Sequence, residues 1–150
     1  MSRSDFLATH GYYLEELDVG MNAVASKTFT ATDIATYAAV SGDTNPLHLD
    51  EAFATKTRFG TRIVHGMLTV SLWSALLGTR LPGPGSIYMG QDIKFVKPVH
   101  IGDTVTARVT VAEIDDTRQR VYLDTDCRVG DTQVAAGRAV VWVPRRGGDR

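Results

Sequence analysis

The chain has little of several features that would point to a particular environment or partner. Its only cysteine is Cys127, so no disulfide can form within the 150 residues. The formal net charge is −1, with 16 basic and 17 acidic residues, which leaves no positive field for non-specific binding of nucleic acid. No repeat, linker or low-complexity segment divides the chain. We therefore expect one domain, 1–150, with a sizeable core.

Long apolar runs are also missing. The longest stretch without a charged residue, 63–79, is shorter than the about 20 residues of a membrane-spanning helix, and it contains His, Ser and Thr. The first ten residues lack the apolar segment of a secretory signal peptide. We expect a cytoplasmic protein without membrane contact. At the Gly-rich C-terminus, Arg145, Arg146 and Arg150 predict a solvated, flexible tail from about residue 145.

Several catalytic and cofactor motifs are absent as well. There is no Gly-x-Ser-x-Gly sequence, which would mark a serine nucleophile. There is no Cys/His spacing and no His-Glu-x-x-His sequence of the kinds that bind zinc. Gly83-Pro84-Gly85 lacks the lysine and the strand–helix context of a phosphate loop. The sequence predicts neither a metal nor a bound cofactor.

Hydrophobic periodicity predicts helices in the first half of the chain and strands in the second. Thr30-Ala-Thr-Asp33 matches a capping box that begins a helix ending near Ser41-Gly42. A short helix is expected over 50–55. The segment 66–77 is apolar around most of a helical wheel, which is typical of a core helix. Strands are predicted at 24–28, 86–96, 104–114, 118–129 and 133–143. One buried helix with five strands favours an α+β fold, in which an antiparallel sheet wraps around a central helix.

The segment 41–54 carries the residues best suited to chemistry. Asp43 and His48 lie five residues apart, and Pro46 prevents a continuous helix between them. A bend there would turn a carboxylate and an imidazole toward one point, where they could hold a water and move its protons. The Asn45 amide could be a third ligand for that water, or it could form an Asx turn before Pro46.

The run Tyr37-Ala-Ala-Val-Ser-Gly-Asp-Thr-Asn-Pro-Leu-His48, followed after five residues by Ala54, resembles the signature of the MaoC-like (R)-specific enoyl-CoA hydratases. The similarity continues through 62–68, 81–88 and 95–99, and so covers most of 30–143. The resemblance implies a hot-dog fold, a homodimer or higher homo-oligomer, and reversible hydration of trans-2-enoyl-CoA to the (R)-3-hydroxyacyl-CoA. CoA would then be part of the substrate, with no separate cofactor.

One glycine and one serine complete the expected catalytic centre. Gly66 begins the core helix, where backbone amides lack intrahelical partners and the dipole favours negative charge. The resemblance places the amide that stabilises the thioester oxygen at this glycine, and close helix–sheet packing is the alternative. Ser74 is expected to be buried, and the resemblance implies that it contacts Asp43. Its alternative role is a bond back to its own helix.

The remaining candidates concern the acyl chain and the CoA phosphates. The resemblance implies that Leu77 closes the acyl pocket and limits it to short chains of roughly four to six carbons, with a place in the core as the alternative. Arg62, Arg80 and Lys97 are candidates for CoA phosphate contacts, although most surface cations are simply solvated. His65 is expected to have a structural role.

Other functions remain open. The chain could be a 3-hydroxyacyl-carrier-protein dehydratase, an acyl-CoA thioesterase, or a non-catalytic partner subunit of a heteromeric dehydratase. The loop with Asp43 and His48 favours hydration over thioester cleavage. A non-catalytic role is disfavoured because the chain contains all four of the residues expected at the centre, namely Asp43, Asn45, His48 and Gly66.

Overall fold

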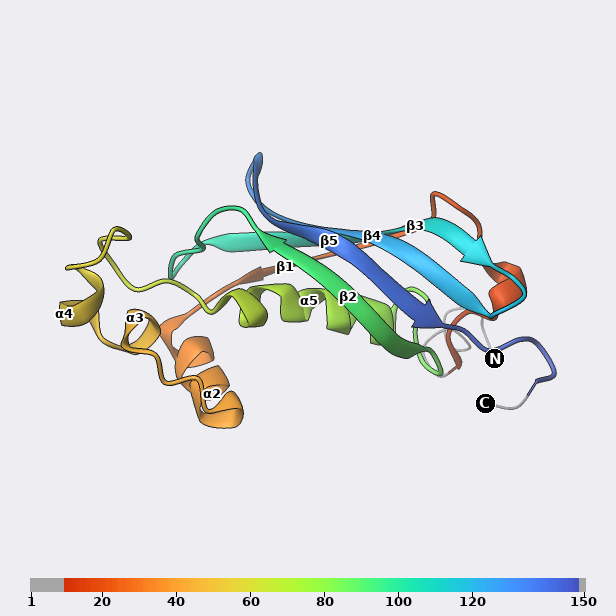
Figure 1. Cartoon of the computed structure of the whole chain (residues 1–150), viewed down its shortest axis with the longest axis horizontal. Coiled ribbons are helices and arrows are strands. Elements are labelled where there is room, and N and C mark those ends of the chain that lie inside the picture. Colours follow the sequence, from red (N-terminus) through yellow and green to blue (C-terminus); the bar gives the residue numbers. More distant parts are fainter. Residues whose placement is uncertain (1–9, 149–150) are drawn as a thin grey trace.

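The computed structural model describes residues 10–148, which form one curved sheet lying along a long helix (Figure 1). The first elements are the 3₁₀ helix η1 (Leu14–Glu16), strand β1 (Asn22–Thr28) and the helices α2 (Ala31–Ser41), α3 (Pro46–Leu49), α4 (Glu51–Ala54) and α5 (Gly66–Thr79). Strands β2 (Ile87–Phe95), β3 (Thr104–Asp115), β4 (Arg120–Val129) and β5 (Thr132–Trp142) follow. The one-turn helices α3 and η1 were not predicted from the sequence.

The five strands form a single antiparallel sheet in the order β1-β3-β4-β5-β2. Helix α5 packs against β1, β2, β3 and β4 on one face of the sheet. Helices α2, α3 and α4 lie together beyond the N-terminal end of α5 (Figure 1). The prediction of an α+β fold with an antiparallel sheet around a central helix is confirmed.

The core lies between α5 and the inner face of the sheet. On β3 the buried residues alternate with exposed ones, as a strand with one covered face requires, and they are Val105, Ala107, Val109 and Val111. From the helix side, the fully buried Trp73 donates its indole N–H to the carbonyl oxygen of Asp126, at 3.1 Å. Cys127 is fully buried in this core, and burial raises the pKa of its thiol to about 12.

Only one side of α5 is covered, which corrects the expectation of a helix buried on nearly every side. Its buried side is formed by Thr69, Val70, Trp73, Leu76 and Leu77. A continuous stripe on the opposite side is exposed and consists of Met67, Ser71, Ser74, Ala75 and Gly78. These positions recur at intervals of three and four residues, so they occupy one face of the helix. A single sheet can cover only one face, and this one leaves the stripe open.

The entry to the catalytic segment follows the predicted cap. The Thr30 hydroxyl accepts the Asp33 N–H, and the Asp33 carboxylate accepts the Thr30 N–H at 2.9 Å. At the other end of α2, Gly42 has a φ of 79°, a left-handed conformation that favours glycine. The chain therefore leaves the helix abruptly just before Asp43, which places that residue on the outside of a turn.

The C-terminal arginines form ion pairs, whereas a solvated tail was expected from residue 145. Arg145 pairs with Asp116 at 3.0 Å, and Arg146 pairs with Glu16 at 2.7 Å. Arg150 lies outside the described residues. Within 10–148, no helix is both long and apolar enough to cross a membrane.

Candidate active site

Three titratable side chains meet at the N-terminal end of α5. The Asp43 carboxylate and one ring nitrogen each from His48 and His65 lie within 4.8 Å of one another. Asp43 comes from the turn after α2, His48 from α3, and His65 from the N-cap position of α5. Asp43 is exposed, whereas both histidines are buried. The predicted convergence of Asp43 and His48 is therefore present, and His65 joins them.

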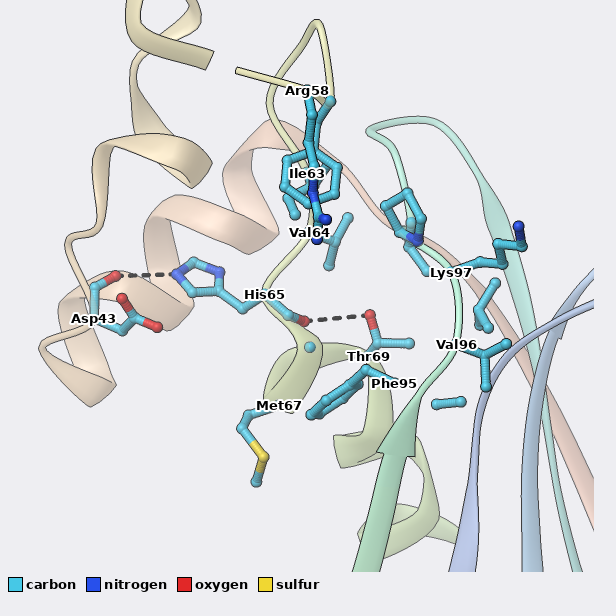
Figure 2. Close-up of a pocket in the computed structure, with 16 residues that line it drawn as sticks. Asp43, Arg58, Ile63, Val64, His65, Met67, Thr69, Phe95, Val96 and Lys97 are labelled. Carbon is cyan, nitrogen blue, oxygen red and sulfur yellow. Dashed lines mark hydrogen bonds between the residues drawn. The ribbon is translucent and has the colours of Figure 1, made fainter.

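Short-range hydrogen bonds fix the backbone around Asp43. Its N–H donates to the Ser41 hydroxyl at 3.1 Å, and its carboxylate accepts the Asn45 N–H at 3.3 Å. Its carbonyl oxygen accepts a hydrogen bond from Nε2 of His65 at 3.0 Å (Figure 2). The second carboxylate oxygen thus remains available for a water or a substrate. The rigid turn expected around this residue is built from these bonds.

His48 is oriented by a backbone carbonyl from another segment. Pro46 starts α3 at a position where its missing N–H costs nothing, and the one turn of helix places His48 facing inward. Its Nδ1 lies 2.8 Å from the carbonyl oxygen of Ile63. A carbonyl only accepts, so Nδ1 carries the proton of the neutral ring. This tautomer leaves Nε2 with a lone pair that can accept a proton from a water.

Asn45 caps α3, which agrees with the turn-forming alternative. Its side-chain oxygen accepts the Leu47 N–H at 3.0 Å. The amide N–H₂ group of this exposed side chain makes no hydrogen bond within residues 10–148. A contact with the reacting water is therefore a proposal that adds to the cap.

The geometry of the two imidazoles is poorly suited to binding one metal ion. Their ring centroids lie 3.9 Å apart and the ring planes are inclined by only 30°. The lone pair of an imidazole nitrogen lies in the ring plane, so two stacked rings direct their lone pairs along nearly parallel planes. The cluster of Asp43, His48 and His65 is better arranged for proton transfer on a small molecule.

A cavity of about 360 Å³ adjoins Asp43 and His65 (Figure 2). It is lined by Asp43, residues 58–59, 63–67 and 95–99, Thr69, Val134 and Ala135. Gly66 forms part of the wall as the first residue of α5, so its N–H has no acceptor within the helix. A Cβ at Gly66 would lie 2.7 Å from Cε1 of Phe95, so the close packing offered as the alternative is also present.

The three cationic residues that were predicted to contact CoA phosphates lie at different places in the structure. Lys97 lines the cavity. Arg62 does not line it and lies 3.4 Å from the Glu51 carboxylate. The Thr61 hydroxyl and the Arg62 N–H lower the pKa of that Glu51 carboxyl by hydrogen bonding to it. Arg62 thus ties the 58–65 loop to α4.

Arg80 lies away from the cavity. It follows the last turn of α5, about 20 Å along the helix from Gly66, and donates to the carbonyl oxygen of Val24. The cation that sequence reasoning missed is Arg58, which lines the cavity and lies 4.9 Å from the centre of the Phe59 ring. Nothing in its local sequence distinguishes Arg58 from an ordinary loop arginine.

Ser74 and Leu77 do not reach the cavity in this chain. Ser74 is exposed on the open stripe of α5, about 12 Å along the helix from Gly66, which corrects the expectation of a buried hydroxyl. Leu77 is 1% exposed and belongs to the hydrophobic core, as its alternative reading expected. The exposure of Ser74 and the burial of Leu77 both follow because the sheet covers only one side of α5.

Comparison with known proteins gives a consistent result. Residues 15–132 match the family model described as a MaoC like domain. The chain is 47% identical over 147 residues to the (R)-specific enoyl-CoA hydratase of Rhodospirillum rubrum, covering 98% of this chain and 100% of that protein. It is 48% identical over 134 residues to the 3-hydroxybutyryl-CoA dehydratase of Methylorubrum extorquens, covering 89% and 85%. The solved structure of the (R)-hydratase from Aeromonas caviae involved in PHA biosynthesis superimposes with a TM-score of 0.84 at 48% identity, covering 87% and 99%.

Proposed function

We propose, since this chain belongs to the MaoC-like domain family, that it is an (R)-specific enoyl-CoA hydratase acting reversibly on trans-2-enoyl-CoA. The observation that carries the proposal is the juxtaposition of the Asp43 carboxylate and the His48 ring beside a cavity whose wall includes the first residue of α5. In this arrangement a base and a helix N-terminus line the same cavity, and the partner of the base, His48, lies beside Asp43. These are the groups that addition of water to an enoyl thioester requires.

The reaction follows from the placement of these groups. A water held between Asp43 and His48 loses a proton to the dyad as its oxygen bonds to the β-carbon. The electron pair of the carbon–carbon double bond moves toward the thioester carbonyl, where negative charge develops on the oxygen. The Gly66 N–H, which has no acceptor inside α5, stabilises that charge. A proton from the dyad then bonds to the α-carbon, and the balance is one water added across the double bond.

Other thioester reactions fit this centre less well. A thioesterase attacks the carbonyl carbon, whereas a dyad that also supplies a proton to carbon suits addition across the double bond. A carrier-protein dehydratase would use the same centre, so only the carrier distinguishes it. The names of the two similar proteins refer to CoA substrates, and this supports CoA as the carrier here. We propose that no cofactor is needed beyond the CoA of the substrate.

The product of the reaction tests the proposal. If one water held by the dyad provides both the hydroxyl and the α-proton, addition is syn. The (R)-specific hydratases to which the chain is similar support the (R) alcohol as the product. Hydration of crotonyl-CoA in heavy water, followed by NMR assignment of the diastereomer, measures both properties. An (S) product, or release of free CoA thiol in place of hydration, would overturn the assignment. Comparison of kcat/KM for CoA and carrier-protein substrates separates the two dehydratase readings.

We propose short acyl chains of roughly four to six carbons. The four-carbon substrate in the name of the Methylorubrum extorquens protein supports this preference. Each methylene group by which two substrates differ is expected to change the free energy that discriminates between them by about 1–3 kcal/mol. Crotonyl-CoA and 2-octenoyl-CoA should therefore differ clearly in kcat/KM. Leu77 lies in the core and does not line the cavity, so the proposed preference does not rest on it.

We propose that the enzyme is a cytoplasmic homodimer. Strand β2 forms one edge of the sheet, and large apolar side chains on and beside it are exposed, namely Ile87, Tyr88, Met89, Phe95 and Val96. The open stripe of α5 is a further uncovered surface. An edge strand with unpaired backbone groups and exposed apolar side chains is suited to pairing with a second copy. Sedimentation velocity should give twice the chain mass, and an active monomer would contradict the proposal.

A further inference from the structure

The side chain of His65 is not used by the proposed reaction, yet it contacts both members of the dyad. It is 1% exposed. Its Nε2 lies 3.0 Å from the carbonyl oxygen of Asp43, and its ring lies against the ring of His48 with 3.9 Å between centroids. It also precedes Gly66 directly in the chain. One residue therefore touches the base, its partner and the start of the helix that stabilises the oxyanion.

The tautomer of His65 follows from its bond to Asp43. Because a carbonyl oxygen only accepts, Nε2 must carry the proton, and Nδ1 then has a lone pair. That Nδ1 atom is buried and has no hydrogen-bond partner among residues 10–148. A buried polar atom without a partner costs stability. A phenylalanine of similar shape would fill the same space without this cost, so packing alone does not account for the imidazole.

The position of His65 in α5 adds a second cost. It is the N-cap residue, and its side chain makes no capping hydrogen bond. Ser, Thr, Asp or Asn would accept a helix N–H there and stabilise α5. The chain therefore has an N-cap residue that does not cap and that leaves a ring nitrogen unsatisfied. The one polar bond that the side chain does make is the bond to the backbone of Asp43.

We propose that His65 is a positioning residue that holds Asp43 and His48 in one geometry relative to the Gly66 amide. Its Nε2–H fixes the backbone of the base, and its ring supports the face of the His48 ring. Both contacts originate one residue before the oxyanion amide, so movement of the 41–49 loop against α5 would break them. This inference rests on the proposed hydratase activity, and its contacts can also be observed without substrate.

Two substitutions of His65 separate its contacts, and a third substitution elsewhere is the control. His65→Phe keeps an aromatic ring against His48 and removes the donor to Asp43, whereas His65→Gln keeps a donor and removes the ring. Val109→Ala is the matched control, because Val109 is fully buried on β3 and does not line the cavity. Each variant is compared with wild type by thermal melting and by kcat and KM on crotonyl-CoA.

We expect His65→Phe to lower kcat by about 10–100-fold with little change in KM, since small displacements of a catalytic group have effects of this size. His65→Gln should recover part of that loss, and Val109→Ala should lower the melting temperature without a comparable loss of kcat. Wild-type kcat in His65→Phe would overturn the proposal. So would losses of kcat that follow melting temperature as they do in Val109→Ala.

An NMR measurement keeps the inference separate from the proposed function. Long-range proton–nitrogen spectra of the wild-type protein should show the Nε2–H tautomer for His65 and the Nδ1–H tautomer for His48. This result is expected with or without activity on crotonyl-CoA. The opposite tautomer at His65 would overturn the proposed bond to Asp43 even in an active enzyme. An inactive wild-type protein with both expected tautomers would instead count against the hydratase assignment alone.

Discussion

Replacing Asp43 by Asn, or His48 by Gln, is expected to lower kcat for hydration of crotonyl-CoA by roughly 10²–10⁴, the usual range for positioned acid–base groups. Asn keeps an oxygen that can accept the Asn45 N–H, which Asp43 accepts at 3.3 Å, but it cannot take up a proton at neutral pH. The loss of the ultraviolet absorbance of the enoyl thioester measures turnover directly.

The fold should tolerate the Asp43→Asn change. Asp43 is exposed, and substitutions at exposed positions usually change stability by less than about 0.5 kcal/mol. The double variant should lose much less than the product of the two single effects, because both side chains act on one water. Near-wild-type turnover in either single variant would remove the mechanism. Fully multiplicative losses would assign Asp43 and His48 to separate steps.

Removing the backbone N–H of Gly66 should have the second largest effect on kcat. Gly66→Pro removes this N–H and is compatible with the first position of a helix, where the N–H has no intrahelical acceptor. The preceding residue, His65, already has a ψ of 133°, which a following proline requires. Phe95 would collide with the new ring, so the change is made in a Phe95→Ala background. We expect kcat to fall by about 10²–10³, the effect of removing one oxyanion donor.

The matched control for the amide is Gly66→Ala in the same Phe95→Ala background. Alanine retains the N–H and adds a Cβ, so it reproduces the steric change without the loss of the donor. Its kcat should remain much closer to that of the Phe95→Ala parent than the kcat of the proline variant. Equal activities of the alanine and proline variants would show that Gly66 serves packing and that another group stabilises the thioester oxygen.

The parts of the fold and site that the sequence predicted depend on local chemistry. The capping box at Thr30 and Asp33, the glycine that ends α2 and the proline that prevents a continuous helix between Asp43 and His48 each act within a few residues. Together they determine how the chain bends around Asp43 and His48. The alternation of buried and exposed residues similarly identified the strands, because one covered face imposes a period of two.

The parts that were missed depend on contacts between distant segments. Ser74 was expected to be buried because its helix is apolar, but the face on which it lies is not covered by the sheet. Arg80 was placed near the site by its order in the chain, although α5 carries it to the far end. The contacts of His65 with Asp43 and His48 join three segments, and no local pattern predicts them.

The open stripe of α5 also has a steric consequence. Apart from Met67, its side chains are no larger than a hydroxymethyl group, at Ser71, Ser74, Ala75 and Gly78. Helix axes separate by about 8–10 Å according to the side chains between them, so residues of this size permit an approach near the short end of that range. A second copy seated here would bring its backbone almost against α5. The small side chains of the stripe would then determine how much space is left between the two copies. One added methyl group on this face would reduce that space.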